Sequence, residues 1–581
     1  MKNYKKVYAA FILAGGLILH GCNGIFDDLA INPNQPSMGA YFTSPSAVND
    51  AVMTMYGYMS TQRCLGASGS KTTIIRSDEA SSNSDYGKPG MFGADLNASY
   101  YTIEQPTLMY TTASQASYII ETAPSVDFSG NEELRNAYMG EAYFWRAFAH
   151  YYLLINFRNI SPIRQMPRNG DDYVRPLEKP AAVWDFIQED LAHAKELLPV
   201  KGYWDSKNAG RVTKASAAAL LGKAYLYRSG IEQYYGEDKT TFYSEAAKEF
   251  GDVIDGKYGT YDLTKNYADN FDVAHENNEE SILEFQFLGD VDNAGFNPGL
   301  ATSGLAFDSR GLMLPGAGVG YEGVVHNWLY NAFVNSVDKD GYTDIRMFST
   351  MIFNDLDASI HLRNDAGGNP VRLEGPGGYK WEELYPAKNG KEGFATVSNP
   401  LAHSFKAGIR KGIDCSMPTQ TEADGTPKLV GVGAGVKEYV YNQPRAHGVN
   451  WRYIRYADVL MMYAESVVSG GTPASNMTPL QAVNKVRGRA NMSELPSVTM
   501  ADIQNERILE FALEGHRFYD LLRWGKLASR FTELQESDPN FKKFISADDF
   551  KGFVTNKHEW LPIPINEVNS NPYITENNPG Y

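Results

Sequence analysis

The stretch NERILEFALEGHRFYDLLRWG, residues 505–525, decides the fold prediction. Apolar side chains recur along it at a spacing close to the 3.6 residues of a helical turn, which predicts one buried helix over the whole stretch. These side chains are Ile508, Phe511, Ala512, Phe518, Tyr519 and Leu522. Thr499 and Asp502 form a capping-box pattern at its start, and Gly525 stands where a glycine commonly ends a helix.

Charged side chains of both signs interrupt this apolar pattern. They are Glu506, Arg507, Glu510, Glu514, His516, Arg517, Asp520 and Arg523. Spacings of three and four residues let opposite charges pair along a helix. Because an unpaired buried charge strongly destabilises a fold, these side chains must pair if the helix is buried. We therefore interpret them as structural rather than catalytic.

The composition describes a large folded protein with an acidic balance of charge. The 581 residues are 43% hydrophobic and 13% aromatic, which permits an extensive core. The formal net charge is −16 at pH 7. Proteins that bind nucleic acid place basic residues against the phosphates, so this balance argues against nucleic acid as a partner.

The N-terminus has the pattern of an export signal. Lys2, Lys5 and Lys6 precede a mostly apolar run over residues 7–19, which is too short to span a bilayer as a helix. The run ends in LHGC at residues 19–22, which is similar to a bacterial lipobox. We expect residues 1–21 to be a lipoprotein signal peptide, and residues 22–45 to be a tether that is lipidated at Cys22. The alternative is an ordinary signal peptide followed by a chance cysteine.

Sequence patterns for metal, cofactor and catalytic sites are weak. Cys64 and Cys415 allow either one disulfide or two buried thiols, and no Cys/His spacing typical of a metal site is present. The GxGxxG match over residues 318–323 lacks the flanking strand and helix of a dinucleotide site. Adjacent acidic pairs are interpreted as solvated surface in a chain this acidic. We expect no metal, no cofactor and no catalytic residues.

Helical periodicity returns in several segments outside the opening stretch. Helices are predicted over residues 44–59, 132–157, 181–198, 214–229 and 242–254. Small and bulky residues alternate in them, as they do where helices pack in pairs. AAALLGKAYLYR and YSEAAKEFGDVI resemble the two helices of a tetratricopeptide-type hairpin. Residues 451–465 and 480–489 are also predicted to be helical.

Two regions read as irregular, and both offer the chemistry that sugars need. Residues 66–105 and 260–430 are rich in Gly, Asn and Asp, apart from a predicted strand at 281–287 and a helix at 325–334. Long loops in a folded body are often functional. Sugar C–H faces stack on flat aromatic rings, and sugar hydroxyls bind polar side chains. The predicted ligand-binding residues are Asp78, Asp85, Tyr86, Tyr100, Phe296, Arg310, Tyr321, Trp328, Tyr379 and Trp381.

Trp381 is the strongest single candidate among these residues, because it lies between GPGGY and EELY. The alternative for each ring is that it packs beneath a loop. That alternative carries most weight for Trp328, which falls on a predicted helix.

Several segments together resemble the SusD/RagB family of nutrient-binding outer-membrane lipoproteins. They are ERILEFALEGHRFYDLLRWG, WRYIRYADVLMMYAE, AAALLGKAYLY and the chain end LPIPINEVNSNPYITENNPGY. The resemblance implies a mainly α fold, with a tetratricopeptide-like helix-pair scaffold and a loop-rich inserted ligand-binding region. The SusD-like body would span residues 46–581, with scaffold at about 107–260 and 437–525 and the variable ligand-binding region at about 260–430.

The same resemblance implies a function. The expected protein is a non-enzymatic, lipid-anchored lipoprotein of the outer membrane, exposed at the cell surface, that captures oligosaccharides. It would deliver them to a SusC-like TonB-dependent transporter. The alternatives are a peptide ligand, as in the RagB branch, a carbohydrate hydrolase, and a docking scaffold without a soluble ligand.

Overall fold

The computed structural model describes most of the chain after residue 41. The described residues are 42–61, 63–66, 69, 71–81, 100–287, 324–375, 378, 380–385, 387, 390–391, 405–412, 429–431, 437–439, 449–538 and 552–581. Cys22 and Cys415 therefore lie outside the described residues. Cys64 is a buried free thiol, and burial raises its pKa. No helix in the described ranges has the length and apolar character needed to cross a membrane.

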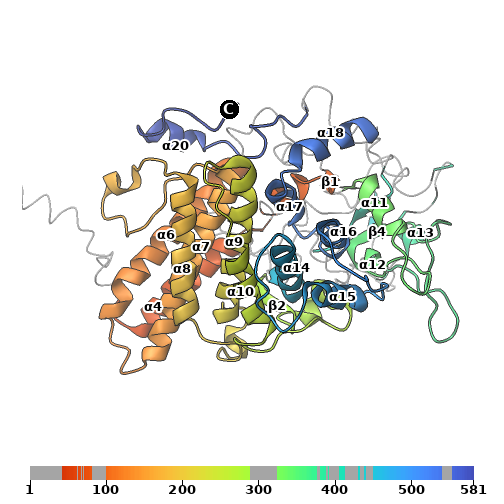
Figure 1. The fold of residues 1–581 in the computed structure, drawn as a ribbon, viewed down its shortest axis with the longest axis horizontal. Coiled ribbons are helices and arrows are strands. Elements are labelled where there is room, and N and C mark those ends of the chain that lie inside the picture. Colours follow the sequence, from red (N-terminus) through yellow and green to blue (C-terminus); the bar gives the residue numbers. More distant parts are fainter. Residues whose placement is uncertain are drawn as a thin grey trace, which may run out of the picture.

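Long helices that pack on one another in chain order build the first part of the molecule (Figure 1). They are α4 (Pro45–Ser60), α6 (Tyr100–Thr122), α7 (Glu132–Phe157), α8 (Pro180–Leu197), α9 (Lys214–Tyr235) and α10 (Tyr243–Ile254). Helix α7 contacts α6 and α8, and α9 contacts α8 and α10. This succession of packed helix pairs confirms the predicted mainly α, tetratricopeptide-like scaffold.

Small residues allow these helices to approach closely, as the alternating pattern predicted. A Cβ added to Gly222 of α9 would lie 2.8 Å from the ring of Phe250 in α10. A Cβ at Gly140 of α7 would lie 2.9 Å from Leu198, just after α8. Such spacings are far below van der Waals contact, so only glycine fits at either crossing.

The C-terminal helices continue the scaffold, because α10 packs against α14. They are α14 (Tyr456–Val468), α15 (Pro479–Arg489), α16 (Met500–Glu510), α17 (Arg517–Arg523), α18 (Leu527–Ser537) and α20 (Ile565–Ser570). Thr499 and Asp502 form the predicted capping box of α16. Short 3₁₀ turns connect the elements at Ala123–Ser125, Gly170–Tyr173, Ser206–Asn208, Tyr267–Phe271 and Val273–His275.

The prediction of one helix over residues 505–525 is wrong. Helix α16 ends at Glu510, and α17 begins only at Arg517. Between them Leu513 has a φ of 62° and Gly515 a φ of 86°, so the backbone turns through the left-handed region twice. Helix α17 and residues 511–516 are buried throughout, whereas α16 is buried along one face only. Apolar side chains therefore continue across the break, and periodicity alone does not reveal the turn.

A strand also replaces the first turns of the helix predicted over residues 451–465. Strand β8 (Trp451–Arg455) pairs antiparallel with β2 (Ser281–Phe285), and α14 begins directly after it. All five residues of β8 are buried. A strand buried on both faces has no alternation of polar and apolar residues, which explains why the sequence read as helix.

Part of the region expected to be an irregular loop is interior structure. Residues 72–81 are buried, and they include most of the π-helix η1 (Lys71–Ile75) and all of strand β1 (Ala80–Ser81). Strand β1 joins an antiparallel sheet in the order β1-β3-β5-β4, with β3 at Val324–Val325, β5 at Ala407–Ile409 and β4 at Met351–Phe353. This sheet connects the early chain to the region around residues 324–412.

Short elements make up the described part of that region, on the right of Figure 1. They are α11 (Asn327–Val334), α12 (Met347–Thr350) and α13 (Trp381–Leu384). Later in the chain, strands β6 (Leu429–Gly431) and β7 (Lys437–Tyr439) pair with each other. The predicted helix at 325–334 corresponds to α11, and the predicted strand at 281–287 corresponds to β2.

Candidate functional site

A cluster of buried charges lies where β8, α16 and the turn after α16 meet. The Arg455 guanidinium at the end of β8 donates to Glu280 at 2.6 Å, to Glu510 at 2.6 Å and to Glu514 at 2.8 Å. Arg489 and Arg346 bind Glu510 from other sides. The side chains of this Arg455 cluster are buried, so each charge depends on its partners for stabilisation.

The cluster fixes the protonation of its carboxylates. Burial alone would raise the pKa of Glu510, but Arg489, Arg455 and Arg346 lower it to about 2. Glu510 therefore stays ionised near neutral pH. The predicted pairing of charges in the opening stretch is confirmed, although the partners of Glu510 come from other segments of the chain and not from its own helix.

A second set of ion pairs extends the network into α9 and α14. Arg507 binds Asp458 and Asp520, each at 2.8 Å, and Arg523 binds Glu465 at 2.6 Å. The neighbouring ring of His516 is buried, and burial followed by the Lys223 charge lowers its pKa to about 4. The ion-paired groups bind one another, and an imidazole with a pKa near 4 is only a weak base.

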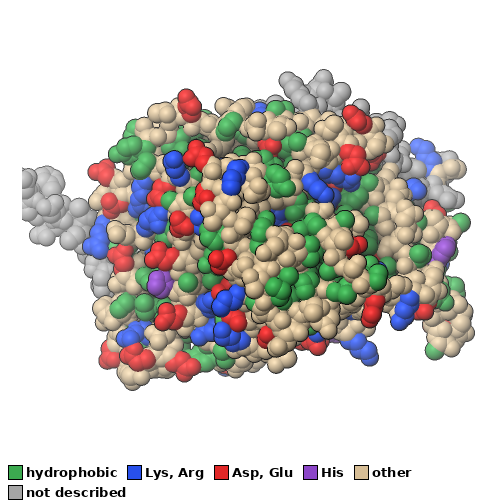
Figure 2. Space-filling view, viewed as in Figure 1, with side chains coloured by type: hydrophobic (Ala, Val, Ile, Leu, Met, Phe, Trp, Pro, Cys, Tyr) green, Lys and Arg blue, Asp and Glu red, His purple; other side chains and the backbone are tan. Residues whose placement is uncertain are grey.

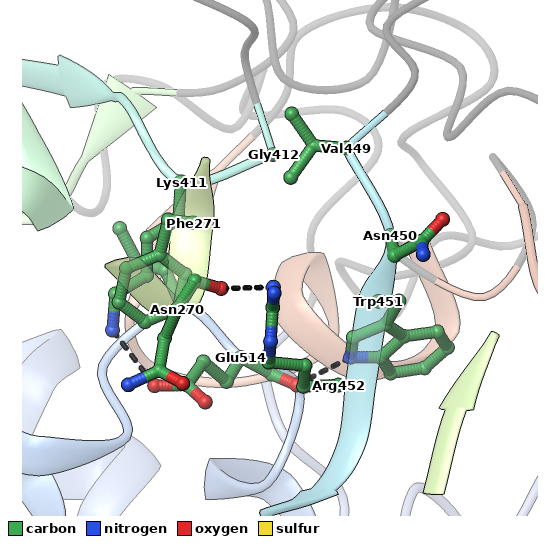
Figure 3. Close-up of a pocket in the computed structure, with 10 residues that line it drawn as sticks. Asn270, Phe271, Lys411, Gly412, Val449, Asn450, Trp451, Arg452 and Glu514 are labelled. Carbon is green, nitrogen blue, oxygen red and sulfur yellow. Dashed lines mark hydrogen bonds and ion pairs between the residues drawn. The ribbon is translucent and has the colours of Figure 1, made fainter. Parts of the chain in front are cut away.

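A small cavity opens beside the Arg455 cluster (Figure 3). Figure 3 shows Lys411 directed at Glu514, and the Trp451 indole directed at the Glu514 carbonyl oxygen, with distances of 2.8 and 3.2 Å. Burial lowers the pKa of Lys411 to about 8. The cavity volume is about 30 Å³, an order of magnitude below the roughly 300–1,000 Å³ of small-molecule sites. It is too small for a sugar ring.

Asp78, a predicted ligand-binding residue, is interior. Its carboxylate binds Arg517 at 2.9 Å and Arg530 at 2.6 Å, and its side chain has no exposed surface. The two guanidinium groups lower its pKa against the effect of burial. The expectation that Asp78 contacts a ligand is wrong, because both oxygens are committed to arginines on α17 and α18.

Trp328 belongs to the same group of contacts. It is half-buried on α11, and its indole N–H donates to the backbone carbonyl of Asp78. The Arg530 guanidinium lies over its ring, 4.2 Å from the centroid. A ring covered in this way packs the α11–α18 junction, as the alternative interpretation of Trp328 predicted.

Trp381, the strongest candidate from sequence, is a core residue. It is 6% exposed at the first position of α13, and its ring lies 4.6 Å from that of Tyr385. The prediction of an exposed stacking platform is therefore wrong for Trp381. The short helix directs its charged residues Glu382 and Glu383 to solvent and its aromatic residues inward, a pattern that follows from amphipathicity rather than ligand binding.

The other predicted residues remain unplaced. Tyr100 is the first residue of α6, but its side chain is not described. The remaining candidates lie outside the described residues and stay predictions: Cys22, Asp85, Tyr86, Phe296, Arg310, Tyr321 and Tyr379.

A larger cavity lies elsewhere, and the sequence reasoning missed it. Its volume is about 400 Å³, and its walls come from α6, from residues 161–175 and from residues 564–570. The one signal in the sequence is a polar stripe at helical spacing on α6, formed by Thr107, Tyr110, Thr111 and Ser114. Nothing in the sequence shows that two distant segments close over this stripe.

Among the described residues, no group of three or more His, Cys, Asp or Glu side chains is placed to hold a metal ion. On the face shown in Figure 2, basic and acidic side chains are interspersed over the helical part of the molecule. They do not gather there into a basic patch of the kind that binds nucleic acid.

Two family models match the chain. The model described as the SusD family matches residues 421–581, and the model described as starch-binding and associating with the outer membrane matches residues 33–226. Together the two matches cover more than half of the chain. The chain belongs to the SusD/RagB family.

Individual SusD-like proteins are similar over most of their length. One from Bacteroides ovatus is 26% identical over 420 residues, which span 71% of this chain and 64% of that protein, just under two thirds of its length. SusD-like protein P2 from Formosa agariphila is 25% identical over 608 residues, and the alignment covers both chains in full. Surface glycan-binding protein A from Bacteroides thetaiotaomicron, solved in complex with laminarihexaose, has the same fold. Its TM-score is 0.65 at 19% identity, covering 92% of this chain and 100% of that one.

The two SusD/RagB matches cover two separate parts of the chain and leave the interval between them unmatched. The Arg455 cluster draws Arg455, Glu510 and Glu514 from the C-terminal match, and the helices α4 to α8 and the first part of α9 fall within the N-terminal match. Residues 227–420 lie between the two matches and overlap the predicted variable region. Several predicted ligand-binding residues belong to this interval: Phe296, Arg310, Tyr321 and Tyr379.

Proposed function

We propose that this protein is a cell-surface lipoprotein that binds glycans and delivers oligosaccharides to a SusC-like TonB-dependent transporter in the outer membrane. The observation that carries the proposal is membership of the SusD/RagB family, in which a protein of the same fold has been solved with laminarihexaose. The buried charges of the Arg455 cluster act as scaffold in this proposal, because they bind one another. The protein then acts by binding and has no catalytic role.

We assign ligand contact to those predicted residues that are not packed in the described interior of the protein. They are Asp85, Tyr86, Tyr100, Phe296, Arg310, Tyr321 and Tyr379. Tyrosine and phenylalanine supply rings on which sugar C–H groups stack, while Asp85 and Arg310 supply partners for hydroxyl groups. Affinity should be modest, because the desolvation of sugar hydroxyls offsets much of the gain from stacking.

Glycan binding is tested by calorimetric titration of the soluble protein, beginning at residue 24, with laminarin, starch, xylan, mannan and a peptide digest. We expect heat with one glycan class and none with peptides. The double variant Tyr86→Ala/Tyr321→Ala should lose about tenfold or more in affinity, by analogy with stacking energies of about 1–3 kcal/mol per ring measured for bases.

The matched control for these substitutions is Tyr234→Ala, because Tyr234 is 56% exposed on the scaffold helix α9. It should bind glycan like the wild type. Heat from the peptide digest alone would instead support the RagB-like alternative. Release of new reducing ends from a bound glycan would contradict the non-enzymatic proposal.

Lipidation gives a separate prediction. Cys22→Ala should abolish acylation and release the protein from the membrane fraction, because acyl chains contribute about 0.8 kcal/mol per buried CH₂ and provide the proposed anchor. Fractionation of cells that express either form, followed by immunoblotting, measures this. Full retention of Cys22→Ala in the outer membrane would show that another part of the protein holds it there.

A further inference from the structure

The cavity of about 400 Å³ beside α6 is built from three parts of the chain. Figure 1 shows α20, in blue, lying across the upper end of the orange helices, and residues of α6, of the 161–175 segment and of the α20 segment line the cavity. Of the predicted ligand-binding residues whose side chains the structure describes, Asp78, Trp328 and Trp381, none lines it. Its volume lies within the range of about 300–1,000 Å³ that is typical of small-molecule sites.

Hydrogen bonds hold these walls in place without a ligand. The Asn571 side-chain amide donates to the Arg175 backbone carbonyl at 2.7 Å, which ties the C-terminal segment to the 161–175 segment. The Ser161 hydroxyl donates to the same carbonyl at 3.1 Å, and the Ser161 N–H donates to the Tyr110 hydroxyl on α6 at 3.4 Å. The cavity is therefore preformed, which lowers the entropic cost of binding.

Polar groups converge inside it. Burial raises the pKa of the Tyr110 hydroxyl, and the nearby Glu567 carboxylate raises it further, while Arg175 acts in the opposite sense. Burial raises the pKa of Glu567 to about 7. Among the described residues, no ion pair or side-chain hydrogen bond engages the Glu567 carboxyl group. It is thus a half-buried group that lacks a described partner and is available to a hydroxyl group of a ligand.

The mouth of the cavity carries an exposed ring. Tyr173 ends the 3₁₀ turn Gly170–Tyr173 and is 60% exposed, so its ring is open to a ligand. Hydroxyls of Thr107, Thr111 and Ser114 lie along the α6 wall. Apolar surface comes from Pro106, Ile163 and Pro564.

This combination selects for an uncharged ligand with both polar and apolar faces. Arg175 and Glu567 give the cavity one group of each sign, so a strongly charged ligand gains little from it. Hydroxyls, an amide at Asn566 and the free carboxyl group suit a ligand that is rich in hydroxyl groups. The ring of Tyr173 and the proline surface suit its C–H faces.

We infer that this cavity is a second saccharide site, which binds an end of a neutral oligosaccharide between Tyr173, Glu567 and the polar stripe of α6. The inference rests on the proposed glycan-binding function but uses different residues. A protein with two such sites holds one polysaccharide chain at two points, which slows its release relative to either site alone.

The test is calorimetric titration with laminarihexaose, maltohexaose and cellohexaose as separate probes. The wild type should bind the recognised hexasaccharide with a stoichiometry of two. Tyr173→Ala removes the exposed ring, and Ser114→Phe fills the cavity, so each variant should weaken one of the two events at least tenfold. Tyr234→Ala serves as the control, because Tyr234 is similarly exposed but lies on α9 and does not line the cavity.

The two proposals fail in different ways. A single site that is lost in Tyr86→Ala/Tyr321→Ala and unchanged in Tyr173→Ala and Ser114→Phe would overturn the second site and leave the proposed function standing. A single site that is lost only in the cavity variants would support ligand binding in the cavity. It would contradict the assignment of ligand binding to Tyr86 and Tyr321. Absence of binding to all three hexasaccharides would overturn the second site, whereas the proposed function would be overturned only if laminarin, starch, xylan and mannan also gave no heat.

Discussion

Replacing Arg455 by methionine is expected to destabilise the protein by about 3–5 kcal/mol, because removing one partner of a buried ion pair leaves its partners uncompensated. Arg455 donates to Glu280, Glu510 and Glu514, and all of these side chains are buried. Methionine keeps an unbranched apolar chain in the same place, so packing changes little. The midpoint of urea unfolding at pH 7, compared with that of the wild type, measures the effect.

Arg164→Met is the matched control. Arg164 binds Glu178 at 2.6 Å, as short as the contacts of Arg455, but the two side chains are 40% and 32% exposed. Exposed pairs contribute only about 0–1 kcal/mol, so this variant should unfold almost like the wild type. Equal losses of stability from Arg164→Met and Arg455→Met would show that burial does not explain the contribution of the Arg455 cluster to the free energy of unfolding.

Acid should reduce the difference between Arg455→Met and the wild type. The pKa of Glu510 is about 2 in the folded protein, below its usual value near 4.5, so its ion pairs stabilise the fold fully above about pH 4.5. That stabilisation is lost as the pH falls toward 2. The gap between variant and wild type should therefore be largest near pH 7 and smaller at pH 3. A gap that grows in acid would contradict the assignment.

The helical scaffold was predictable because its signals are local. The predicted helix over residues 132–157 has the bounds of α7, Ser44 caps α4, and Thr499 with Asp502 caps α16. Each of these signals uses residues within four positions of one another. The turn at Leu513 is also local, but leucine rarely adopts a positive φ, and here its surroundings impose it. The conformational preference of leucine therefore does not predict this turn.

The roles of single site candidates were less predictable, because they depend on partners far away in the chain. Asp78 became interior because it meets Arg517 and Arg530, which lie more than 400 positions later. Trp381 was mispredicted for a different reason, because its partner Tyr385 is only four positions away. An exposed ring and a buried ring have the same appearance in that glycine-rich sequence. The pairing of the charges could be inferred from the cost of burying them, whereas the identity of each partner could not.

Replacing Gly515 by leucine should be the most damaging change within the opening stretch. Gly515 has a φ of 86°, a conformation that costs a residue with a side chain about 1–3 kcal/mol. A Cβ there would lie 2.7 Å from the Thr73 hydroxyl oxygen and 3.3 Å from the Trp451 ring. Overpacking of a tight interior adds about 1–3 kcal/mol, so the expected total is about 2–6 kcal/mol in urea unfolding.

Gly57→Leu separates this effect from the loss of a glycine in general. Gly57 lies inside α4 with no atom within 4 Å of a built Cβ, and its φ is not positive. Leucine favours helix over glycine by about 0.5–1 kcal/mol, so this variant should be neutral or slightly more stable.

The turn at Gly515 holds Glu514 against Arg455 and Lys411. Gly515→Leu should therefore also weaken the Arg455 cluster, and combining it with Arg455→Met should cost less than the sum of the two single changes. Strict additivity would show that the turn and the cluster act independently.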